Sequence, residues 1–181
     1  EFQGLLQGKY DFMSGIHTSF KDELLNQSGE LAEAYKSQLK FQRTPFIKTD
    51  YLGFQMDSSA EINSNSPLMD VRVRQAISHA IDKNEMVKYL RNNTVFAAYS
   101  GFVPPMLNPA NESQYYPYDI AKARALLAEA GFPDGKNMSE VVLSTTGDYT
   151  DLMEYIQHAL GKLGIPVRIN VLQGPALREQ S

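Results

Sequence analysis

Apolar residues recur at helical spacing in the middle of the chain and predict two successive helices. The first apolar face consists of Val73, Ile77, Ala80 and Ile81. Asp70 directly precedes this run, and its carboxylate is expected to cap the first helix. The pattern restarts after Asp82, which is followed by Glu85 at the spacing of a capping box. Residues 70–90 therefore predict a helix, a tight break and a second helix.

The last third of the chain has the pattern of a strand, a helix and a strand. Residues 141–145 and 167–172 are rich in β-branched and apolar residues, which favours strands. Between them lies an apolar stripe at helical spacing, made of Leu152, Ile156, Ala159, Leu160 and Leu163. A helix is also predicted between Asp119, its expected cap, and Gly131, its expected end. Because a helical crossover joins parallel strands, this part predicts an α/β fold.

The first part of the chain is more polar and less periodic. A short strand is expected at residues 10–13, and residues 19–39 predict two short helices separated by residues 26–30. Residues 43–57 contain a proline that blocks a helix, and apolar residues that suit strand positions, so this segment is expected to be extended. Residues 58–67 have the composition of a loop.

Composition and charge narrow the classes of function. The chain has 181 residues, a net charge of −4 and no block of like charges, which disfavours nucleic-acid binding and basic membrane-surface binding. A DNA-reading helix-turn-helix at residues 70–90 is disfavoured too, because its second helix offers few basic residues for phosphate contacts. Cysteine is absent, which removes disulfides, thiol nucleophiles and thiolate metal sites. No apolar run approaches the roughly 18 residues of a membrane-spanning helix.

The sequence carries no recognisable catalytic motif. G-x-S-x-G, H-E-x-x-H, G-x-x-x-x-G-K and G-x-G-x-x-G are all missing. His17, His79 and His158 are scattered, without a second histidine or a carboxylate at ligand spacing. We therefore expect no catalytic residue, no metal and no cofactor, although an enzyme is left unsupported rather than excluded.

A binding crevice is expected beyond the carboxyl end of the strand at residues 141–145, as in other open α/β sheets. The segment STTGDY, residues 144–149, offers hydroxyl groups and a helix N-terminus to a polar or anionic group. For Asp148 we favour the interpretation that its carboxylate caps the following helix, with Thr150 as the other candidate cap. The long connection at residues 100–119 is expected to cover or line something. Two alternatives are left open for a group of aromatic residues, which form either the wall of a cleft or part of the hydrophobic core: Tyr51, Phe54, Tyr115, Tyr116 and Tyr118.

Three segments, in this order, resemble one protein family. They are NSPLMDVRVRQAISHAIDKNEMV at residues 65–87, PYDIAKARALLAEAGFPDG at 117–135 and MEYIQHALGKLGIPVRINV at 153–171. Together they closely resemble the extracytoplasmic solute-binding proteins of ABC transporters, of the oligopeptide- and dipeptide-binding type (family 5). The resemblance extends over residues 51–172, and LLQGKYDFMSGI at residues 5–16 is similar to the family segment that precedes them.

The resemblance implies an α/β fold, namely one lobe of a periplasmic-binding-protein-like (type II, Venus flytrap) fold with a mixed sheet flanked by helices. Residues 1–45 would belong to the first lobe and to the segment that crosses from the first lobe to the second. Residues 46–181 would belong to a second lobe truncated at its C-terminus. The implied function is that of the substrate-binding component of an ABC importer, which captures an oligopeptide- or dipeptide-like solute and delivers it to the permease without catalysis. The implied location is periplasmic or otherwise extracytoplasmic, with a lipoprotein anchor on the full-length protein.

The chain departs from the family at the expected site. STTGDY lacks the arginine with which some dipeptide binders hold the ligand's carboxylate, and the family aspartate that holds the ligand's ammonium would follow residue 181. Gln55 is the residue nearest to the family's Tyr-Asn pair after the crossing strand, and Arg72 and Arg74 match a helix motif and are assigned structural roles. Ligand contacts are expected from Tyr51, Phe54, Gln55, Thr145, Thr146 and Asp148. The alternatives are a non-peptide solute, such as a nickel chelate, a sugar or an opine, and a ligand-sensing domain linked to a regulator or a chemoreceptor.

Overall fold

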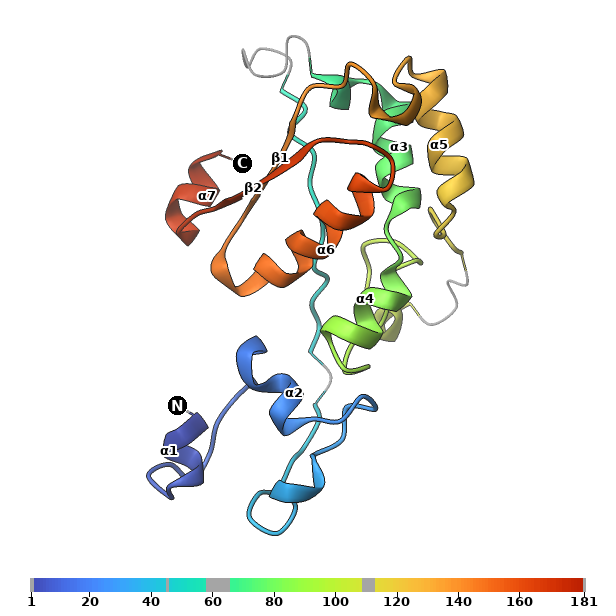
Figure 1. Ribbon diagram of the computed structural model, residues 1–181. Coiled ribbons are helices and arrows are strands. Elements are labelled where there is room, and N and C mark those ends of the chain that lie inside the picture. Colours follow the sequence, from blue (N-terminus) through green and yellow to red (C-terminus); the bar gives the residue numbers. More distant parts are fainter. Residues whose placement is uncertain (1, 45, 58–65, 109–112, 181) are drawn as a thin grey trace. The chain divides into compact units, whose positions relative to one another are not determined.

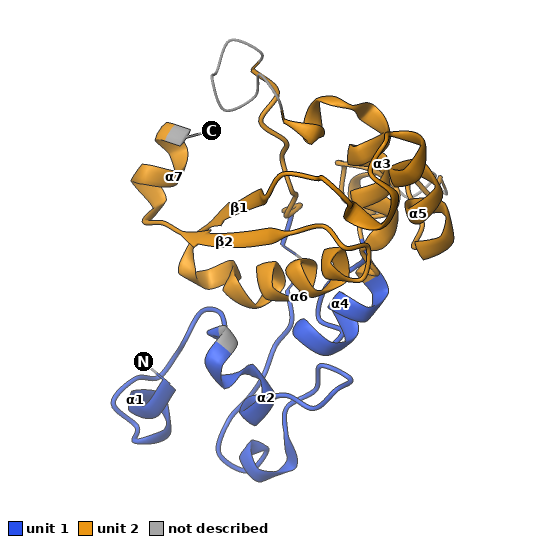
Figure 2. Ribbon diagram, turned by 45° about the horizontal axis from the view of Figure 1, so that its top comes forward, with its two compact units in different colours: residues 1–47, 84–97 blue, residues 48–83, 98–181 orange. Residues whose placement is uncertain are grey.

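The structure, a computed structural model, contains two compact units (Figure 1). The residues that it describes are 2–44, 46–57, 66–108 and 113–180. Figure 2 shows unit 1 in blue and unit 2 in orange; they comprise, respectively, residues 1–47 with 84–97 and residues 48–83 with 98–181. The predicted lobe boundary after residue 45 stays a prediction, because compactness by itself does not identify a lobe.

Two helices of unit 2 pack side by side, α3 (Val71–Ala80) and α5 (Ile120–Glu129) (Figure 1). Each begins after the predicted aspartate: Asp70 accepts a hydrogen bond from the backbone N–H of Arg72 (2.8 Å), and Asp119 accepts one from that of Lys122 (2.9 Å). The predicted apolar face of α3 is buried, and α5 packs its own buried residues against that helix. The buried residues of the two helices include Val73, Ala76, Ile77, Ala80, Ala123 and Leu127.

The two arginines of α3 bind within unit 2. The guanidinium of Arg72 donates to the Asp70 carboxylate and, through Nη1, to the backbone carbonyl of Glu129 (2.6 Å), the last residue of α5. Arg74 Nη1 donates to the carbonyl of Leu68 (2.7 Å), in the 3₁₀ turn before α3. These bonds satisfy carbonyls that helix ends leave without an intrahelical partner, which agrees with the structural roles assigned to both arginines.

The predicted parallel strand–helix–strand unit is confirmed. It consists of β1 (Val141–Thr145), α6 (Thr150–Gly161) and β2 (Val167–Val171). The strands pair in parallel from Val141 opposite Val167 to Thr145 opposite Val171, and α6 packs against both. The core beside this sheet contains Val141, Leu143, Ile156, Ala159, Leu160, Leu163 and Ile165. The α/β class is confirmed, and the sheet within the described residues is this parallel pair, smaller than the mixed sheet predicted.

The long connection after α4 covers the end of α3 in unit 2. His79, which is 3% exposed, has Nδ1 2.7 Å from the carbonyl oxygen of Pro117 and its ring edge against Tyr116. Lys83 Nζ lies 4.4 Å from the ring centroid of Tyr99, donates to the Tyr116 carbonyl, and has its pKa lowered by burial. The end of this connection therefore covers a buried histidine, as its length suggested, while residues 109–112 lie outside the described part.

The chain continues as α7 (Gly174–Gln180) after β2.

Unit 1 contains the short helices α1 (Phe2–Leu6) and α2 (Lys21–Leu24) and most of α4 (Lys83–Leu90). Phe2 is buried against Phe20 and Tyr35, with ring centroids 5.1 and 6.0 Å away. The other buried residues of this small core are Leu24, Leu25 and Leu31. Within the described residues no helix has the length and apolar character needed to cross a membrane.

One prediction for the first part of the chain is wrong, and another holds only in part. Residues 10–13 form no strand. Residues 43–57, apart from residue 45 outside the described part, are extended as expected, but they join no sheet. Alternating or β-branched residues suit a strand, but a strand also needs a partner for its backbone hydrogen bonds, which one sequence does not reveal. The predicted break at residues 26–30 is confirmed, because the Asn26 side chain accepts from the N–H groups of Ser28 and Glu30. Of the loop predicted at residues 58–67, residues 58–65 lie outside the described part.

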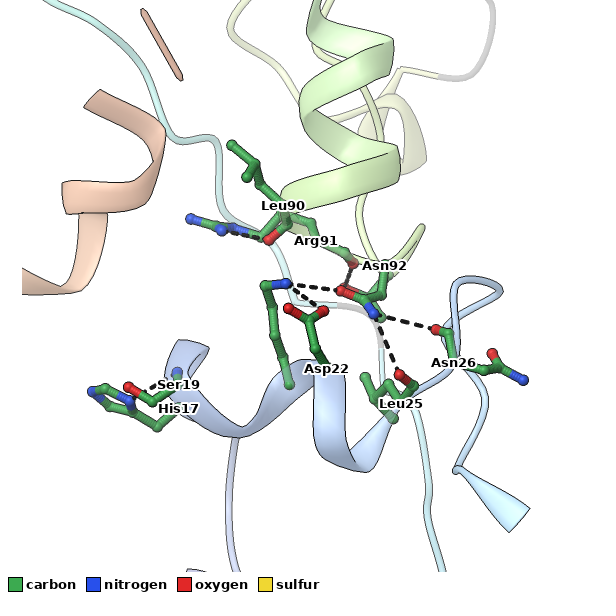
Figure 3. Close-up of polar contacts among 10 residues, drawn as sticks. His17, Ser19, Asp22, Leu25, Asn26, Leu90, Arg91 and Asn92 are labelled. Carbon is green, nitrogen blue, oxygen red and sulfur yellow. Dashed lines mark hydrogen bonds and ion pairs between the residues drawn. The ribbon is translucent and has the colours of Figure 1, made fainter. Parts of the chain in front are cut away.

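A buried asparagine joins two segments of unit 1 (Figure 3). Asn92 is 5% exposed with φ +47°, and its amide donates to the carbonyls of Leu25 (3.4 Å) and Asn26 (3.3 Å). Its Oδ1 accepts from Lys21 Nζ (3.3 Å), which also pairs with Asp22 (2.6 Å). The bond from Lys21 lowers the pKa of Asp22, and Asn92 acts in the same direction, while burial opposes both. The buried carboxamide is thus hydrogen-bonded on both its sides, as buried polar groups require.

Candidate ligand-binding site

The carboxyl end of β1 leads directly into a short turn. Thr145 is 5% exposed, its hydroxyl donates to the carbonyl of Thr146 (3.3 Å), and its own carbonyl accepts from the N–H of Leu172 (2.7 Å). Thr146 is half-buried and precedes the 3₁₀ turn Gly147–Tyr149, which runs straight into α6. The hydroxyl of Thr145 therefore lies inside unit 2, and a ligand contact from this residue stays a prediction.

The cap interpretation favoured for Asp148 is wrong. Tyr149 occupies the position before α6, no side chain caps the helix there, and Asp148 is exposed. The backbone of the 3₁₀ turn takes the place of a cap, since the N–H of Thr150 donates to the carbonyl of Gly147. The Thr150 hydroxyl donates to that same carbonyl (3.0 Å) and so is not a cap either. The carboxylate of Asp148 is left exposed to solvent.

A polar cluster of Lys48, Asp50 and Tyr149 connects this turn to a segment of unit 2 that lies far from it in the sequence. Lys48 Nζ lies 2.8 Å from Asp50 Oδ1 and donates to the Tyr149 hydroxyl, which in turn donates to Asp50 Oδ1 (3.0 Å). Asp50 first, and then Tyr149, raise the pKa of Lys48 above its ordinary value. Lys48 and Asp50 are about half exposed, so this ion pair is expected to contribute less than about 1 kcal/mol to stability.

Two exposed aromatic rings meet beside the polar cluster. The ring centroids of Tyr51 and Phe102 are 4.9 Å apart at 55°, although the residues are 72% and 65% exposed. Thr49 strengthens the link, because its hydroxyl donates to the carbonyl of Phe102 (2.8 Å). Paired rings that remain open to solvent provide an apolar surface for a ligand.

The structure brings only part of the predicted site together. Tyr51 lies on the segment that contacts the turn after β1, whereas Phe54 is half-buried and the Oε1 of Gln55 accepts a local hydrogen bond from the N–H of Asp57 (3.2 Å). The alternative of a buried core does not hold for Tyr51, nor for the exposed Tyr115, Tyr116 and Tyr118. Sequence analysis missed Lys48, Asp50, Phe102 and Tyr149. Asp50 adjoins Tyr51 and Tyr149 ends STTGDY, but contacts across so many residues leave no signal in a single sequence.

The candidate site offers side chains that can bind a ligand. Within the described residues no three His, Asp or Glu side chains gather as metal ligands. Of the two histidines in unit 2, His79 is buried and lies close to the carbonyl of Pro117, and His158 is exposed on α6. In unit 1, His17 Nδ1 accepts a hydrogen bond from the N–H of Ser19 (3.2 Å). What the site offers is hydroxyl groups, one exposed carboxylate, a lysine–aspartate pair and two rings.

Comparison with known proteins identifies the family. The sequence model of the bacterial extracellular solute-binding proteins, family 5 (middle region), matches residues 2–181. The chain belongs to this family. The glutathione-binding protein GsiB of Salmonella choleraesuis is 32% identical over 145 residues, which are 77% of this chain and 26% of GsiB. This family 5 chain therefore spans about a quarter of the length of the curated relatives it matches.

Solved structures of peptide-binding proteins share the fold of this family 5 chain. The periplasmic binding protein DppA from Helicobacter pylori, in complex with the peptide STSA, has a TM-score of 0.65 and 25% identity over 97% of this chain and 31% of DppA. The oligopeptide-binding protein from Thermus thermophilus, complexed with a pentapeptide, has a TM-score of 0.55 and 28% identity over 66% of this chain and 22% of that protein. The resemblance stated from sequence is confirmed, and so is the periplasmic-binding-protein-like fold.

Proposed function

We propose that this family 5 chain is part of the substrate-binding component of an ABC importer. In this function the full-length protein captures a peptide-like solute outside the cytoplasm and delivers it, chemically unchanged, to a membrane permease. The observation that carries the proposal is the family match over residues 2–181. GsiB, which is named for a tripeptide, and the peptide complexes of the two similar structures support a peptide as the solute.

The geometry of the candidate site supports binding of a peptide. A peptide presents donors and acceptors along its backbone, and the turn after β1 presents hydroxyl and carboxylate groups at Thr146 and Asp148. Its apolar side chains find a surface in the exposed rings of Tyr51 and Phe102. We propose ligand contacts from Tyr51, Thr146 and Asp148, with Phe54 and Gln55 beside them. Thr145, which is buried, would hold the turn in place.

The location and the partners follow from the same proposal. A protein that supplies solute to an importer works on the outer side of the cytoplasmic membrane, so we propose that the full-length protein lies in the periplasm or at the cell surface. We also propose that a lipid anchor attaches it to the membrane. Its macromolecular partner would be the permease of the importer. Cleavage of a leader in cells and labelling of the mature protein with a radioactive fatty acid would test the anchor, and an unlabelled mature protein would contradict it.

Peptide capture is tested on the full-length protein by native mass spectrometry with a mixture of random tri- to pentapeptides, and by calorimetry with glutathione and the peptide STSA. We expect one peptide per protein molecule. Tyr51→Ala is expected to weaken binding about tenfold, because it removes half of the exposed ring pair, which corresponds to about 1.4 kcal/mol. Tyr89→Ala, which removes an exposed tyrosine of α4, is the matched control and should bind as the wild type does. Absence of any peptide adduct would overturn the proposed function.

A further inference from the structure

Tyr149 joins residues that are far apart in sequence. Its side chain follows the turn after β1, is half-buried, and has its hydroxyl between two charged groups of an earlier segment of unit 2. The hydroxyl accepts a hydrogen bond from Lys48 and donates one to Asp50, so both of its hydrogen-bonding functions are used. Replacing this tyrosine by phenylalanine would remove both bonds and keep the ring.

Successive residues of the segment from Lys48 to Tyr51 contact two different aromatic residues, Tyr149 and Phe102, in turn. Lys48 and Asp50 bind the Tyr149 hydroxyl, whereas the residues between and after them, Thr49 and Tyr51, contact Phe102. Side chains of an extended chain point to opposite sides at successive residues, which explains this pattern. The segment belongs to no sheet, so these side-chain contacts take the place of a strand partner.

We propose that Tyr149 is a positioning residue of the ligand-binding site. Its hydroxyl holds Lys48 and Asp50, and the short extended segment transmits that position to the ring of Tyr51, which rests on Phe102. The inference depends on the proposed function, because it gives Tyr51 the role of contacting the solute. It adds that the turn after β1 and the aromatic pair act as one preorganised surface rather than as separate contacts.

Preorganisation has a signature that distinguishes it from a purely structural role. The polar cluster is about half exposed, so its loss is expected to change the melting temperature by less than about 2 °C. A segment that is free before binding must be ordered when the ligand binds, and this entropy weakens the affinity. Tyr149→Phe should therefore weaken peptide binding roughly three- to tenfold while leaving thermal stability nearly unchanged.

The experiment uses the full-length protein, Tyr149→Phe, and the double variant with Tyr51→Ala. Peptide affinity by calorimetry should fall in Tyr149→Phe but show no further fall when Tyr51→Ala is already present, because the effect passes through that ring. Tyr155→Phe is the matched control: it also removes a tyrosine hydroxyl bond, to the carbonyl of Asp82, and should bind as the wild type does. An equal loss with and without Tyr51 would overturn the proposal.

Hydrogen exchange of the ligand-free protein separates this proposal from the proposed function. Tyr149→Phe is expected to speed exchange at residues 48–54 several-fold, with residues 120–129 of α5 as the internal reference. Unchanged exchange at residues 48–54 would overturn the positioning role, whether or not a peptide binds. A wild-type protein that binds no peptide would overturn the proposed function, and with it the role of Tyr149 in binding.

Discussion

Gly135 and Gly164 face each other backbone to backbone in unit 2. A Cβ atom on Gly135 would lie 2.1 Å from the carbonyl oxygen of Gly164, and a Cβ atom on Gly164 would lie 2.1 Å from that of Asp134. Both glycines have positive φ, +69° and +76°. The turn after α5 and the turn between α6 and β2 thus approach more closely than any residue with a side chain permits.

Alanine at either of these glycines should destabilise the protein strongly. Gly135→Ala and Gly164→Ala each add a clash with backbone and a left-handed strain of about 1–2 kcal/mol, so we expect a total loss of roughly 3 kcal/mol or more in the free energy of unfolding. Gly161→Ala at the end of α6, where a Cβ meets nothing within 4 Å and φ is not positive, is the control and should be neutral or stabilising by about 0.5 kcal/mol. Urea unfolding of the three variants checks this. Equal stability of Gly161→Ala and Gly164→Ala would contradict it.

Asp70 should make stability depend on pH in the acidic range. The hydrogen bonds from Arg72 hold the pKa of Asp70 below its ordinary value of 3.8. A carboxyl group with a depressed folded-state pKa stabilises the fold above its unfolded-state pKa, and this contribution disappears as the pH falls through the folded-state pKa. Asp70→Asn keeps an oxygen that caps Arg72 but loses the charge. The stability difference between wild type and Asp70→Asn should therefore shrink between pH 5 and pH 2 or so, as measured by urea unfolding.

Asp70→Ala separates the cap from the charge. This variant loses both and is expected to cost about 1 kcal/mol at neutral pH, more than Asp70→Asn costs. A stability difference between wild type and Asp70→Asn that stays constant across the acidic range would show that the charge of Asp70 plays no part.

Asn92 should contribute to stability through its side chain and through its backbone conformation. Asn92→Ala removes the amide that donates to the carbonyls of Leu25 and Asn26, of which the second still accepts from the N–H of Gly29. The substitution also places alanine at φ +47°, so a loss of roughly 2–3 kcal/mol is expected. Asn92→Gly loses the same bonds without the strain and should cost about 1 kcal/mol less. Hydrogen exchange at residues 21–26 should quicken in both variants. If alanine and glycine had the same effect, the strain would be excluded as a cause.

His79 should hold the end of the long connection on α3. Because the Pro117 carbonyl only accepts, the nearby Nδ1 of His79 carries the hydrogen. His79→Gln disturbs this bond and the contact with Tyr116, so we expect a loss of roughly 1–3 kcal/mol and faster hydrogen exchange at residues 113–119. His158→Gln, at an exposed position of α6, is the matched control and should stay within about 0.5 kcal/mol of wild type. Similar effects of the two variants would refute the role of His79.

The elements that sequence analysis predicted correctly are those with a strong local pattern. α3 and α5 begin after the predicted aspartates, and β1, α6 and β2 lie where periodicity placed them. A helix buries one face, and a capping aspartate satisfies N–H groups within the next turn, so both leave their marks in neighbouring residues. α1 was missed because its five residues are too few to show a period.

The candidate site was predicted only in part. The turn after β1 and the ring of Tyr51 were identified, but the cluster that joins them was not. Lys48 and Tyr149 are ordinary residues in their own segments, and they matter because the fold brings them together across the chain. The prediction that Asp148 caps α6 was wrong for a related reason. A 3₁₀ turn before the helix supplies a backbone carbonyl in place of the cap, and the residue types in that turn do not predict it.

By itself, then, the sequence determined the α/β class, the helices α3, α5 and α6, both strands and the resemblance to the solute-binding family, because each depends on the order of residues along the chain. Tertiary structure alone decided which side chains meet: the hydroxyl of Tyr149 with Lys48 and Asp50, the rings of Tyr51 and Phe102, the backbones of Gly135 and Gly164. The physical reason is that local propensities act over a few residues, whereas packing and hydrogen bonds between distant segments depend on where the whole chain places them.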